Sequence, residues 1–295
     1  MSSDVLLSDE AAVAAPLFVS ARLMEAVRFT GVGLHSGEAC AATVSPAPAG
    51  AGICFYRTDG AADGAAILAT AANVVETRLG TVIGAAGGDV VRTIEHLMAA
   101  LALCGIYDAT VAVDGPEIPI LDGSAAEFVD VLRAKAVPGG APVAIGPNRR
   151  VSVRDGDRRI DWRPAPGAGL AVAIAFDDAA IGRSAVRLDR ARLDASTRRR
   201  LARARTFCRL GDVEAMRGGG LALGGSLDNA VVVDGGRVLN EDGLRDADEF
   251  ALHKALDLIG DLHLLGAPLS GEITAVRPGH DLNVAFVRAV EKAVR

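Results

Sequence analysis

The sequence predicts an α+β protein built from two similar layered domains, each with a sheet and helices. The chain has 295 residues, enough for about two domains of ordinary size. Each half contains short strand patterns and about two helix patterns, which indicates an ancient duplication, although no sequence repeat is evident. The segment VPGGAPVAIGP (137–147), rich in Gly and Pro, separates the halves as a linker. We therefore predict domains at residues 20–138 and 139–295.

Composition limits the class of protein. The net charge of −6 argues against general nucleic-acid binding, which needs a basic surface. Four cysteines without a CxxC pair fit a reducing compartment. Residues 1–19 lack the positive start of a secretory signal, and we expect a disordered tail there. No apolar run reaches the roughly 18 residues of a membrane span. We therefore expect a cytoplasmic protein that has no membrane-spanning segment.

The first half begins with strand patterns. Residues 20–60 contain short runs of strand type, interrupted by a turn at GVGLHSG (31–37) and a loop at SPAPAGAG (45–52). Further along, DATVAVDG (108–115) alternates between apolar and other residues, which predicts another strand.

Two helices are predicted in the first half. From Thr93 onward, apolar residues recur at spacings of three and four, at Ile94, Leu97, Met98 and Leu101. The second helix follows Ser124, which we predict as its N-cap. Glu127, three residues later, would complete a capping box.

The second half repeats this mixture. VSVRDGDRRIDWRP (151–164) predicts two strands joined by a turn at Asp-Gly, and GLAVAIAF (169–176) predicts a buried strand. A strand and a turn are expected within residues 221–240. Helices are predicted at 191–205 and, with the strongest pattern, at 250–266. Apolar residues follow one side of the latter helix and leave its opposite side to charged residues.

The helix at 250–266 carries a candidate metal site. His253, Asp257 and Asp261 are spaced by four residues and therefore lie along one face. A His and an Asp one turn apart can reach a single metal ion, and His96 from the first half could supply a third ligand. The alternative is a solvated helix face, where this spacing also occurs by chance. His263 does not share the face, and we expect it at the surface.

Other residues are candidates for acid–base chemistry. Glu95 stands beside His96 and could take a proton from water, although a Glu also simply favours the first turn of a helix. His280, in a loop before the last helix, is a candidate general acid. Lys254 has an ordinary alternative as a solvated side chain, and so does the Thr206 hydroxyl as a candidate oxyanion donor. His35, between glycines, is expected to line a cleft rather than to bind metal.

Together these motifs are similar to one known family. In chain order they are TIEHLMAAL (93–101), PEIPILDGSAAEFV (116–129), RARTF (203–207), GLALGGSLDNAVVVD (220–234), VLNEDGLR (238–245), HKALDLIGD (253–261) and the GH of RPGHDLN (277–283). The chain resembles the UDP-3-O-acyl-N-acetylglucosamine deacetylases of lipid A biosynthesis over about residues 20–290. This resemblance implies a zinc amidase of two α+β domains, with the active site in the cleft between them.

The resemblance also implies roles for single residues. His96, His253 and Asp257 match the ligands of one catalytic Zn²⁺. The residues that match catalytic positions are Glu95 as general base, His280 with Asp261 beside it, and Lys254 and Thr206 at the oxyanion. The residues that match substrate positions are Phe207 near the glucosamine, Phe176 and Arg277 near the uridine and diphosphate, and Leu210, Val213, Ala222 and Gly225 along an acyl passage formed by an inserted strand–helix segment.

The implied reaction is hydrolysis of the N-acetyl group of UDP-3-O-(3-hydroxyacyl)-N-acetylglucosamine, which gives acetate and the free amine. The implied partner is this small molecule alone, and we expect a monomer. Two alternatives remain open at this point. One is a zinc amidase for a different acylated amino sugar, and the other is a non-catalytic carbohydrate-binding relative. A binding protein has no need of Glu95, His280 and Lys254 around three metal ligands.

Overall fold

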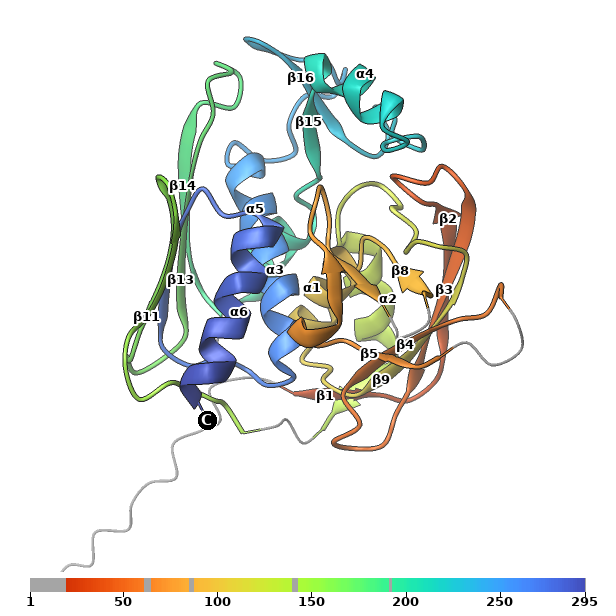
Figure 1. Ribbon diagram of the computed structural model, residues 1–295, viewed down its shortest axis with the longest axis vertical. Coiled ribbons are helices and arrows are strands. Elements are labelled where there is room, and N and C mark those ends of the chain that lie inside the picture. The colour runs from red at the N-terminus through yellow and green to blue at the C-terminus, as the bar shows by residue number, and fades with distance from the viewer. Residues whose placement is uncertain (1–19, 61–64, 85–87, 140–142, 191–192, 295) are drawn as a thin grey trace, which may run out of the picture.

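Two five-stranded sheets with the same topology form the frame of the protein. The computed structural model describes residues 20–60, 65–84, 88–139, 143–190 and 193–294 (Figure 1). The tail predicted at residues 1–19 lies outside these residues. Across the first sheet the strands are β2 (Val27–Val32), β3 (Ala39–Pro46), β9 (Ala109–Asp114), β4 (Ile53–Arg57) and β5 (Ile67–Leu68). Across the second they are β11 (Val151–Asp155), β12 (Arg158–Arg163), β18 (Glu272–Val276), β13 (Gly169–Ala175) and β14 (Arg183–Asp189).

The pairing pattern is identical in the two sheets. In each sheet, the strand that comes last in the sequence lies in the middle. It pairs parallel with the strand that comes third in the sequence, β9 with β4 and β18 with β13. The other neighbouring strands pair antiparallel. This repeated topology confirms the predicted α+β class and supports the duplication that the sequence indicated.

The helices repeat as well. Helix α1 (Glu95–Cys104) precedes the middle strand of the first sheet, and α5 (Glu249–Leu262), continued by a short 3₁₀ turn at His263–Leu265, precedes that of the second. The strands are followed by α2 (Ala126–Lys135) and α6 (His280–Val294), respectively. Helix α3 (Ala195–Ala202) is additional to the second half.

Helices α1, α2, α5 and α6 lie between the two sheets (Figure 1). Helices α5 and α6 pack on the second sheet, α2 packs on the first, and α1 packs against α5 and α2. The apolar core continues through all four layers. On the first sheet, Phe128 of α2 meets the ring of Phe29 edge-on at a centroid distance of 4.7 Å. A site formed between α1 and α5 is therefore deep in the molecule.

Each half also carries an insertion. In the first, β6 (Val74–Glu76), β7 (Val82–Gly84) and β8 (Val90–Val91) form a small sheet that follows a 3₁₀ turn at Ala71–Asn73. In the second, β15 (Phe207–Arg209), α4 (Leu210–Gly218), β16 (Val231–Asp234) and β17 (Arg237–Val238) form a strand–helix–strand unit with parallel β15 and β16. This second insertion stands at one end of the helix layers (Figure 1).

Two helix predictions were wrong in detail. The helix predicted at 191–205 is α3, Ala195–Ala202, with Asp194 accepting a capping hydrogen bond from the Thr197 amide. It ends early because the chain turns toward β15. The capping box at Ser124 does not form either: Ala125 is the N-cap of α2, and Ser124 bonds to Asp122 in the preceding turn.

The predicted division near residue 138 falls between the repeated halves. Pro138 ends β10 (Ala136–Pro138), which pairs with β1 (Ala21–Leu23), and β11 opens the second sheet at Val151. We propose this position as the domain boundary. In the part of the chain that the structure describes, none of the helices combines the length and apolarity that crossing a membrane requires.

Gly260 determines how closely α1 and α5 approach. A Cβ atom at this position would lie 2.1 Å from the carbonyl oxygen of Glu95 and 3.2 Å from the Ala99 nitrogen. Both are backbone atoms of α1, which cannot move aside as the end of a flexible side chain can. Only glycine therefore permits the observed helix spacing.

We expect Gly260→Ala to lower the free energy of unfolding by about 1–3 kcal/mol, because overpacking forces the helices apart. Gly211→Ala is the matched control, since Gly211 lies in α4 with open space around its Cβ position. Chemical denaturation of both variants measures the effect. Equal stability of Gly260→Ala and wild type would contradict the role of this contact.

Candidate metal and catalytic site

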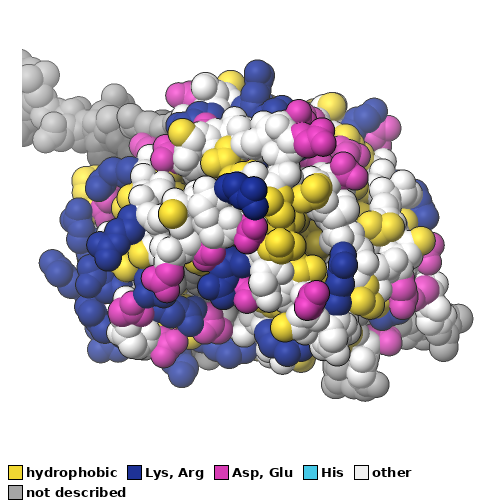
Figure 2. All heavy atoms as spheres, turned by 90° about the horizontal axis from the view of Figure 1, so that it is seen from above, with side chains coloured by type: hydrophobic (Ala, Val, Ile, Leu, Met, Phe, Trp, Pro, Cys, Tyr) yellow, Lys and Arg dark blue, Asp and Glu magenta, His cyan; other side chains and the backbone are white. Residues whose placement is uncertain are grey.

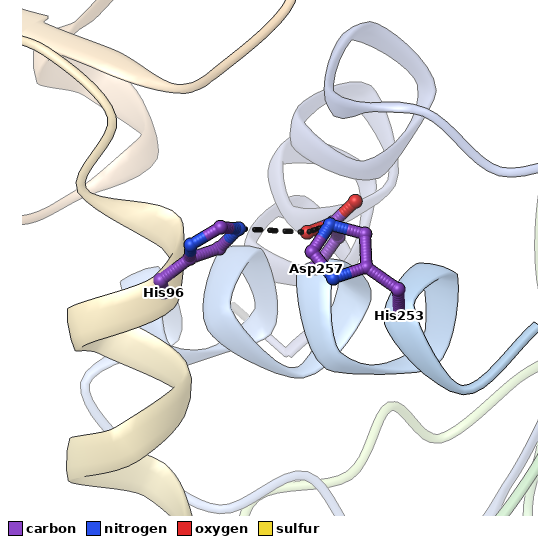
Figure 3. A group of neighbouring side chains, drawn as sticks. All are labelled: His96, His253 and Asp257. Carbon is purple, nitrogen blue, oxygen red and sulfur yellow. Dashed lines mark ion pairs between the residues drawn. The ribbon is translucent and has the colours of Figure 1, made fainter. Parts of the chain in front are cut away.

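Helices α1 and α5 bring three possible metal ligands together. His96 is the second residue of α1, and His253 and Asp257 lie one turn apart on α5. Their side chains point toward one another across the helix interface (Figure 3). The Oδ1 atom of Asp257 is 3.3 Å from Nε2 of His253 and 3.7 Å from Nε2 of His96. All three side chains are buried.

These distances fit a tetrahedral metal ion. Metal–ligand bonds of zinc imply ligand–ligand separations of about 3.3–3.5 Å. The three possible ligand atoms lie within 4.8 Å of one another. Among the described residues, His96, His253 and Asp257 are the His, Cys, Asp and Glu side chains close enough together to hold a metal ion. Oδ1 of Asp257 is buried and has no hydrogen-bond partner, which is costly unless a cation binds there. The residues present therefore fit the cofactor that the resemblance implies.

The two histidines are oriented differently. Nδ1 of His253 lies 3.0 Å from the Ala204 carbonyl oxygen, which can only accept, so Nδ1 carries the proton and Nε2 is free to bind metal. Nδ1 of His96 is buried without a hydrogen-bond partner among the described residues, and its Nε2 faces Asp257. The His96 ring also makes an edge-on contact with the His253 ring at 5.1 Å.

The charge states also suit a metal. Burial lowers the pKa of His96 to about 3 and lowers the pKa of His253, so both rings are neutral at neutral pH. Burial opposes the charge of Asp257. At the low pH where this carboxyl would titrate, the protonated His253 ring and the Lys254 ammonium outweigh burial and hold its pKa far below the usual range. The set thus offers two neutral nitrogens and one carboxylate, the forms that coordinate metal.

Glu95 lies beside this centre and is held in place from one side. Its Oε2 accepts a hydrogen bond of 2.8 Å from the Thr81 amide, and a Cβ on Gly80 would come within 3.1 Å of its Oε1. Burial raises the pKa of Glu95 to about 7, against the opposing effect of the His280 charge nearby. A carboxylate with a pKa close to neutral can both accept and return a proton.

His280 faces Glu95 from the other side of the site. It opens α6 instead of lying in a loop before it, which corrects the sequence expectation. Its Nε2 is 3.8 Å from Oε1 of Glu95, and its Nδ1 is 2.9 Å from Oδ2 of Asp261. Burial would lower the pKa of His280, but the Asp261 and Glu95 charges raise it to about 9. His280 is therefore a cation at neutral pH.

Asp261 is fixed by two residues that sequence reasoning did not identify. The Thr81 hydroxyl donates to its Oδ1 at 2.6 Å, and the Asn283 amide donates to its Oδ2 at 2.8 Å. Asn283 follows His280 by three residues and so shares its side of α6. No comparable signal in the sequence marks Thr81, which comes from the inserted sheet of the first half.

Lys254 and Thr206 complete the surroundings. Nζ of Lys254 donates to Oδ2 of Asp257 at 2.8 Å and lies 5.4 Å from the centre of the Phe207 ring, so Lys254 is not merely solvated. Thr206 is held by its backbone, since its amide donates to Gly123 and its carbonyl accepts from Val231. These two backbone hydrogen bonds fix Thr206 directly before the first residue of β15.

The site opens into two adjoining cavities. A cavity of about 250 Å³ is lined by the three possible ligands together with Glu95, Lys254, Thr206 and His280. Leu34, Leu79, Thr206 and Phe207 also line a larger cavity of about 900 Å³. Figure 2 shows hydrophobic side chains around a hollow on the face that carries the second insertion.

All eight residues predicted near the substrate line the larger cavity. They are His35, Phe176, Phe207, Leu210, Val213, Ala222, Gly225 and Arg277. Sequence reasoning missed other lining residues, among them Arg183, Met216, Leu227 and Leu239. Leu227 and Leu239 lie within quoted motifs, but an apolar side chain in an insertion gives no signal that separates a cavity wall from the core. Arg183 and Met216 lie outside the motifs.

The expectation that His263 lies at the surface was wrong. His263 is buried, and its Nε2 is 2.8 Å from the Ile106 carbonyl oxygen. The helix side that carries charged residues is also buried, since Asp257 and Asp261 are each at most 2% exposed. The reason is the position of α5 between the second sheet, α1 and α6, which covers it on every side.

Comparison with known proteins agrees with this geometry. The family model described as UDP-3-O-acyl N-acetylglycosamine deacetylase (LpxC) matches residues 21–292. A UDP-3-O-acyl-N-acetylglucosamine deacetylase of Phenylobacterium zucineum (strain HLK1) is 49% identical over 267 residues, which cover 89% of each chain. Proteins with the same name from Anaeromyxobacter sp. (strain Fw109-5) and Acidithiobacillus ferrooxidans (strain ATCC 53993 / BNL-5-31) are 46% and 48% identical. The alignments cover 90% and 88% of this chain, and 86% of each relative.

We expect Asp257→Ala to lose metal, because a three-ligand centre then keeps only two. The measurement is the metal content of purified protein after dialysis, with thermal unfolding as a check of the fold. Asp242→Ala, which removes an exposed carboxylate, is the control and should keep its metal. Full metal content in Asp257→Ala would refute the assignment of this ligand.

Proposed function

The chain belongs to the UDP-3-O-acyl-N-acetylglucosamine deacetylase family, and from this premise we propose how its own residues perform the reaction. The protein is an amide hydrolase that removes the N-acetyl group of UDP-3-O-acyl-N-acetylglucosamine in lipid A biosynthesis, which gives acetate and the free amine. The observation that carries the mechanism is the convergence of Glu95, His280 and the three possible ligands on one small cavity.

His96, His253 and Asp257 would hold the metal, which we propose is one Zn²⁺. Two imidazoles and one carboxylate are a ligand set that zinc accepts, and three protein ligands leave one position open. When bound, zinc supplies Lewis acidity, lowering the pKa of water and polarising the amide carbonyl.

Glu95 is the proposed general base. It stands next to the metal ligands, is held by Thr81, and has a pKa raised to about 7 by burial. It takes a proton from the attacking water as the new C–O bond to the acetyl carbon forms. His280, kept cationic by Asp261, faces the same space and donates a proton to the leaving amine as the C–N bond breaks.

Lys254 and Thr206 are the proposed oxyanion donors. Both line the small cavity together with the possible metal ligands, and Lys254 lies over the Phe207 ring. Donors of this kind, fixed before the charge develops, contribute on the order of 3–4 kcal/mol to the transition state. The Lys254 ammonium must then serve Asp257 and the oxyanion together, and its three protons make this feasible.

The larger cavity is the proposed place of the substrate's remaining parts. Phe207 would contact the glucosamine, and Phe176, whose ring meets it edge-on at 5.5 Å, would lie toward the uridine. Arg277 would bind the diphosphate, exchanging its present partner Asp157 for the ligand. The acyl chain would follow the apolar wall of Leu210, Val213, Ala222 and Gly225 in the second insertion. We further propose that the enzyme acts as a cytoplasmic monomer.

We expect Glu95→Gln to keep the fold and metal but to lose about 10²–10⁴-fold in kcat, which is the usual size of general-base assistance. Glutamine keeps the shape of the side chain and cannot accept the proton. The control is Glu127→Gln, an exposed first-turn glutamate of α2. Release of the free amine is measured for both variants. A kcat of Glu95→Gln within a few-fold of wild type would rule Glu95 out.

The pH profile tests the pairing of His280 with Asp261. Because the Asp261 charge raises the pKa of His280, its loss in Asp261→Asn lowers that pKa, and the alkaline limb of kcat/KM should move to lower pH. Asparagine keeps the shape and can still reach Thr81 and Asn283. In His280→Ala the limb should vanish or move. An alkaline limb at the same pH in wild type and both variants would show that His280 is not the titrating acid.

A further inference from the structure

The ring of His35 connects two loops that belong to different halves of the chain. Its Nε2 is 3.2 Å from the carbonyl oxygen of Leu79, in the loop between β6 and β7 in the first half. Its Nδ1 accepts from the amide of Ala222, at 3.4 Å, in the insertion of the second half. The carbonyl oxygen can only accept, so Nε2 carries the proton and Nδ1 is the acceptor. One neutral imidazole thus satisfies both loops.

Both contacted residues have left-handed backbones. Leu79 has φ 63° and Ala222 has φ 55°, and neither is glycine. Such conformations cost free energy and persist only where the surroundings impose them, which is common at functional sites. The ring of His35 supplies a hydrogen bond at each of these two positions. It therefore holds in place two loops that would otherwise relax.

On one side, His35 fixes the wall of the larger cavity. The segment Ala222–Gly224 lies along Leu34 and His35, where the Leu223 amide donates to the His35 carbonyl and the Gly224 amide to that of Leu34. The approach is close, since a Cβ on Gly224 would lie 2.3 Å from the Gly33 carbonyl oxygen. Ala222, on this segment, lines the proposed acyl passage.

The Nε2 side of the His35 ring is connected to Glu95, the proposed general base, by the three consecutive residues Leu79, Gly80 and Thr81. Leu79, whose carbonyl it binds, lines both cavities. Gly80 packs against Oε1 of Glu95, and the Thr81 amide donates to Oε2. A shift of Leu79 must move Gly80 and Thr81, and with them the Glu95 carboxylate.

Glu117 holds the backbone at His35 through hydrogen bonds. This carboxylate is fully buried and accepts hydrogen bonds from the amides of His35 and Ser36 and from the Thr93 hydroxyl. Thr93, itself left-handed with φ 57°, comes two residues before Glu95. The base of the His35 loop is therefore fixed, and the ring acts from a rigid support.

We propose that His35 is a positioning residue that sets the junction between the acyl passage and the catalytic carboxylate. Through Ala222 it fixes how the passage wall meets a long acyl chain, and through Leu79 it fixes the orientation of Glu95. The proposal rests on the function proposed above, and it assigns His35 no contact with the reacting atoms.

Two substitutions separate the two contacts. His35→Gln places an amide nitrogen near the former Nε2 position, so it keeps the bond to Leu79 and loses the bond to Ala222. His35→Asn places an amide oxygen near the former Nδ1 position, so it keeps Ala222 and loses Leu79. Each variant retains one loop contact, which protects the fold.

The substrates are UDP-N-acetylglucosamine derivatives with a long (3-hydroxymyristoyl) or a short (3-hydroxybutyryl) 3-O-acyl chain, and the free amine is measured. For His35→Gln we expect KM for the long-chain substrate to rise about 3–10-fold, the usual effect of one buried hydrogen bond, with kcat and the short-chain KM unchanged. For His35→Asn we expect kcat to fall about 3–10-fold on both substrates, with the ratio of their KM values unchanged.

The control is His263→Gln. His263 is another buried histidine whose Nε2 faces a backbone carbonyl oxygen, and it lines neither cavity. It should leave acyl-chain discrimination unchanged, and all variants should keep wild-type metal content. Parallel changes in the two His35 variants, or no change in either, would overturn the positioning role while wild-type activity upholds the proposed function. A wild type that carries metal and does not release the amine would overturn both.

Discussion

The close contact of α1 with α5 at Gly260 is the constraint on which the rest of the structure depends. His96 and Glu95 lie on the first turn of α1, and the carbonyl oxygen of Glu95 is the atom that a side chain at position 260 would strike. Since α1 and α5 occupy the same place in the two halves, the duplication brings equivalent helices face to face. The three possible metal ligands then come from both halves, and neither half contains the whole group.

Burial of the carboxylates in this centre costs free energy, and different neighbouring groups offset that cost at each carboxylate. Glu95, Asp257 and Asp261 are all buried, and uncompensated carboxylates in such a place are very unfavourable. Asp257 has the Lys254 ammonium, and Asp261 has His280, Thr81 and Asn283. Glu95 has less support, and its pKa rises to about 7 accordingly. The carboxylate with the weakest compensation is thus the one suited to take up a proton.

Local patterns predicted much of this and misjudged what depends on distant contacts. The spacing of His253, Asp257 and Asp261 correctly placed them on one helix face, because helix periodicity is a local property. The same local reasoning placed His263 at the surface, which is wrong because other elements cover α5. Spacing alone offered His96 only as a possible third ligand from the other half, and the family resemblance was needed to select it. Thr81 and Glu117 were missed since their contacts are entirely long-range.

The most direct test is to locate the metal itself. Crystals of the protein grown with Zn²⁺ can be measured at wavelengths on both sides of the zinc absorption edge, and the anomalous difference map shows the ion without reference to activity. The account predicts one strong peak within about 2.0–2.2 Å of Nε2 of His96, Nε2 of His253 and an oxygen of Asp257. A main peak elsewhere, or one that leaves out a ligand from either helix, would contradict the claim that the α1–α5 contact creates the site.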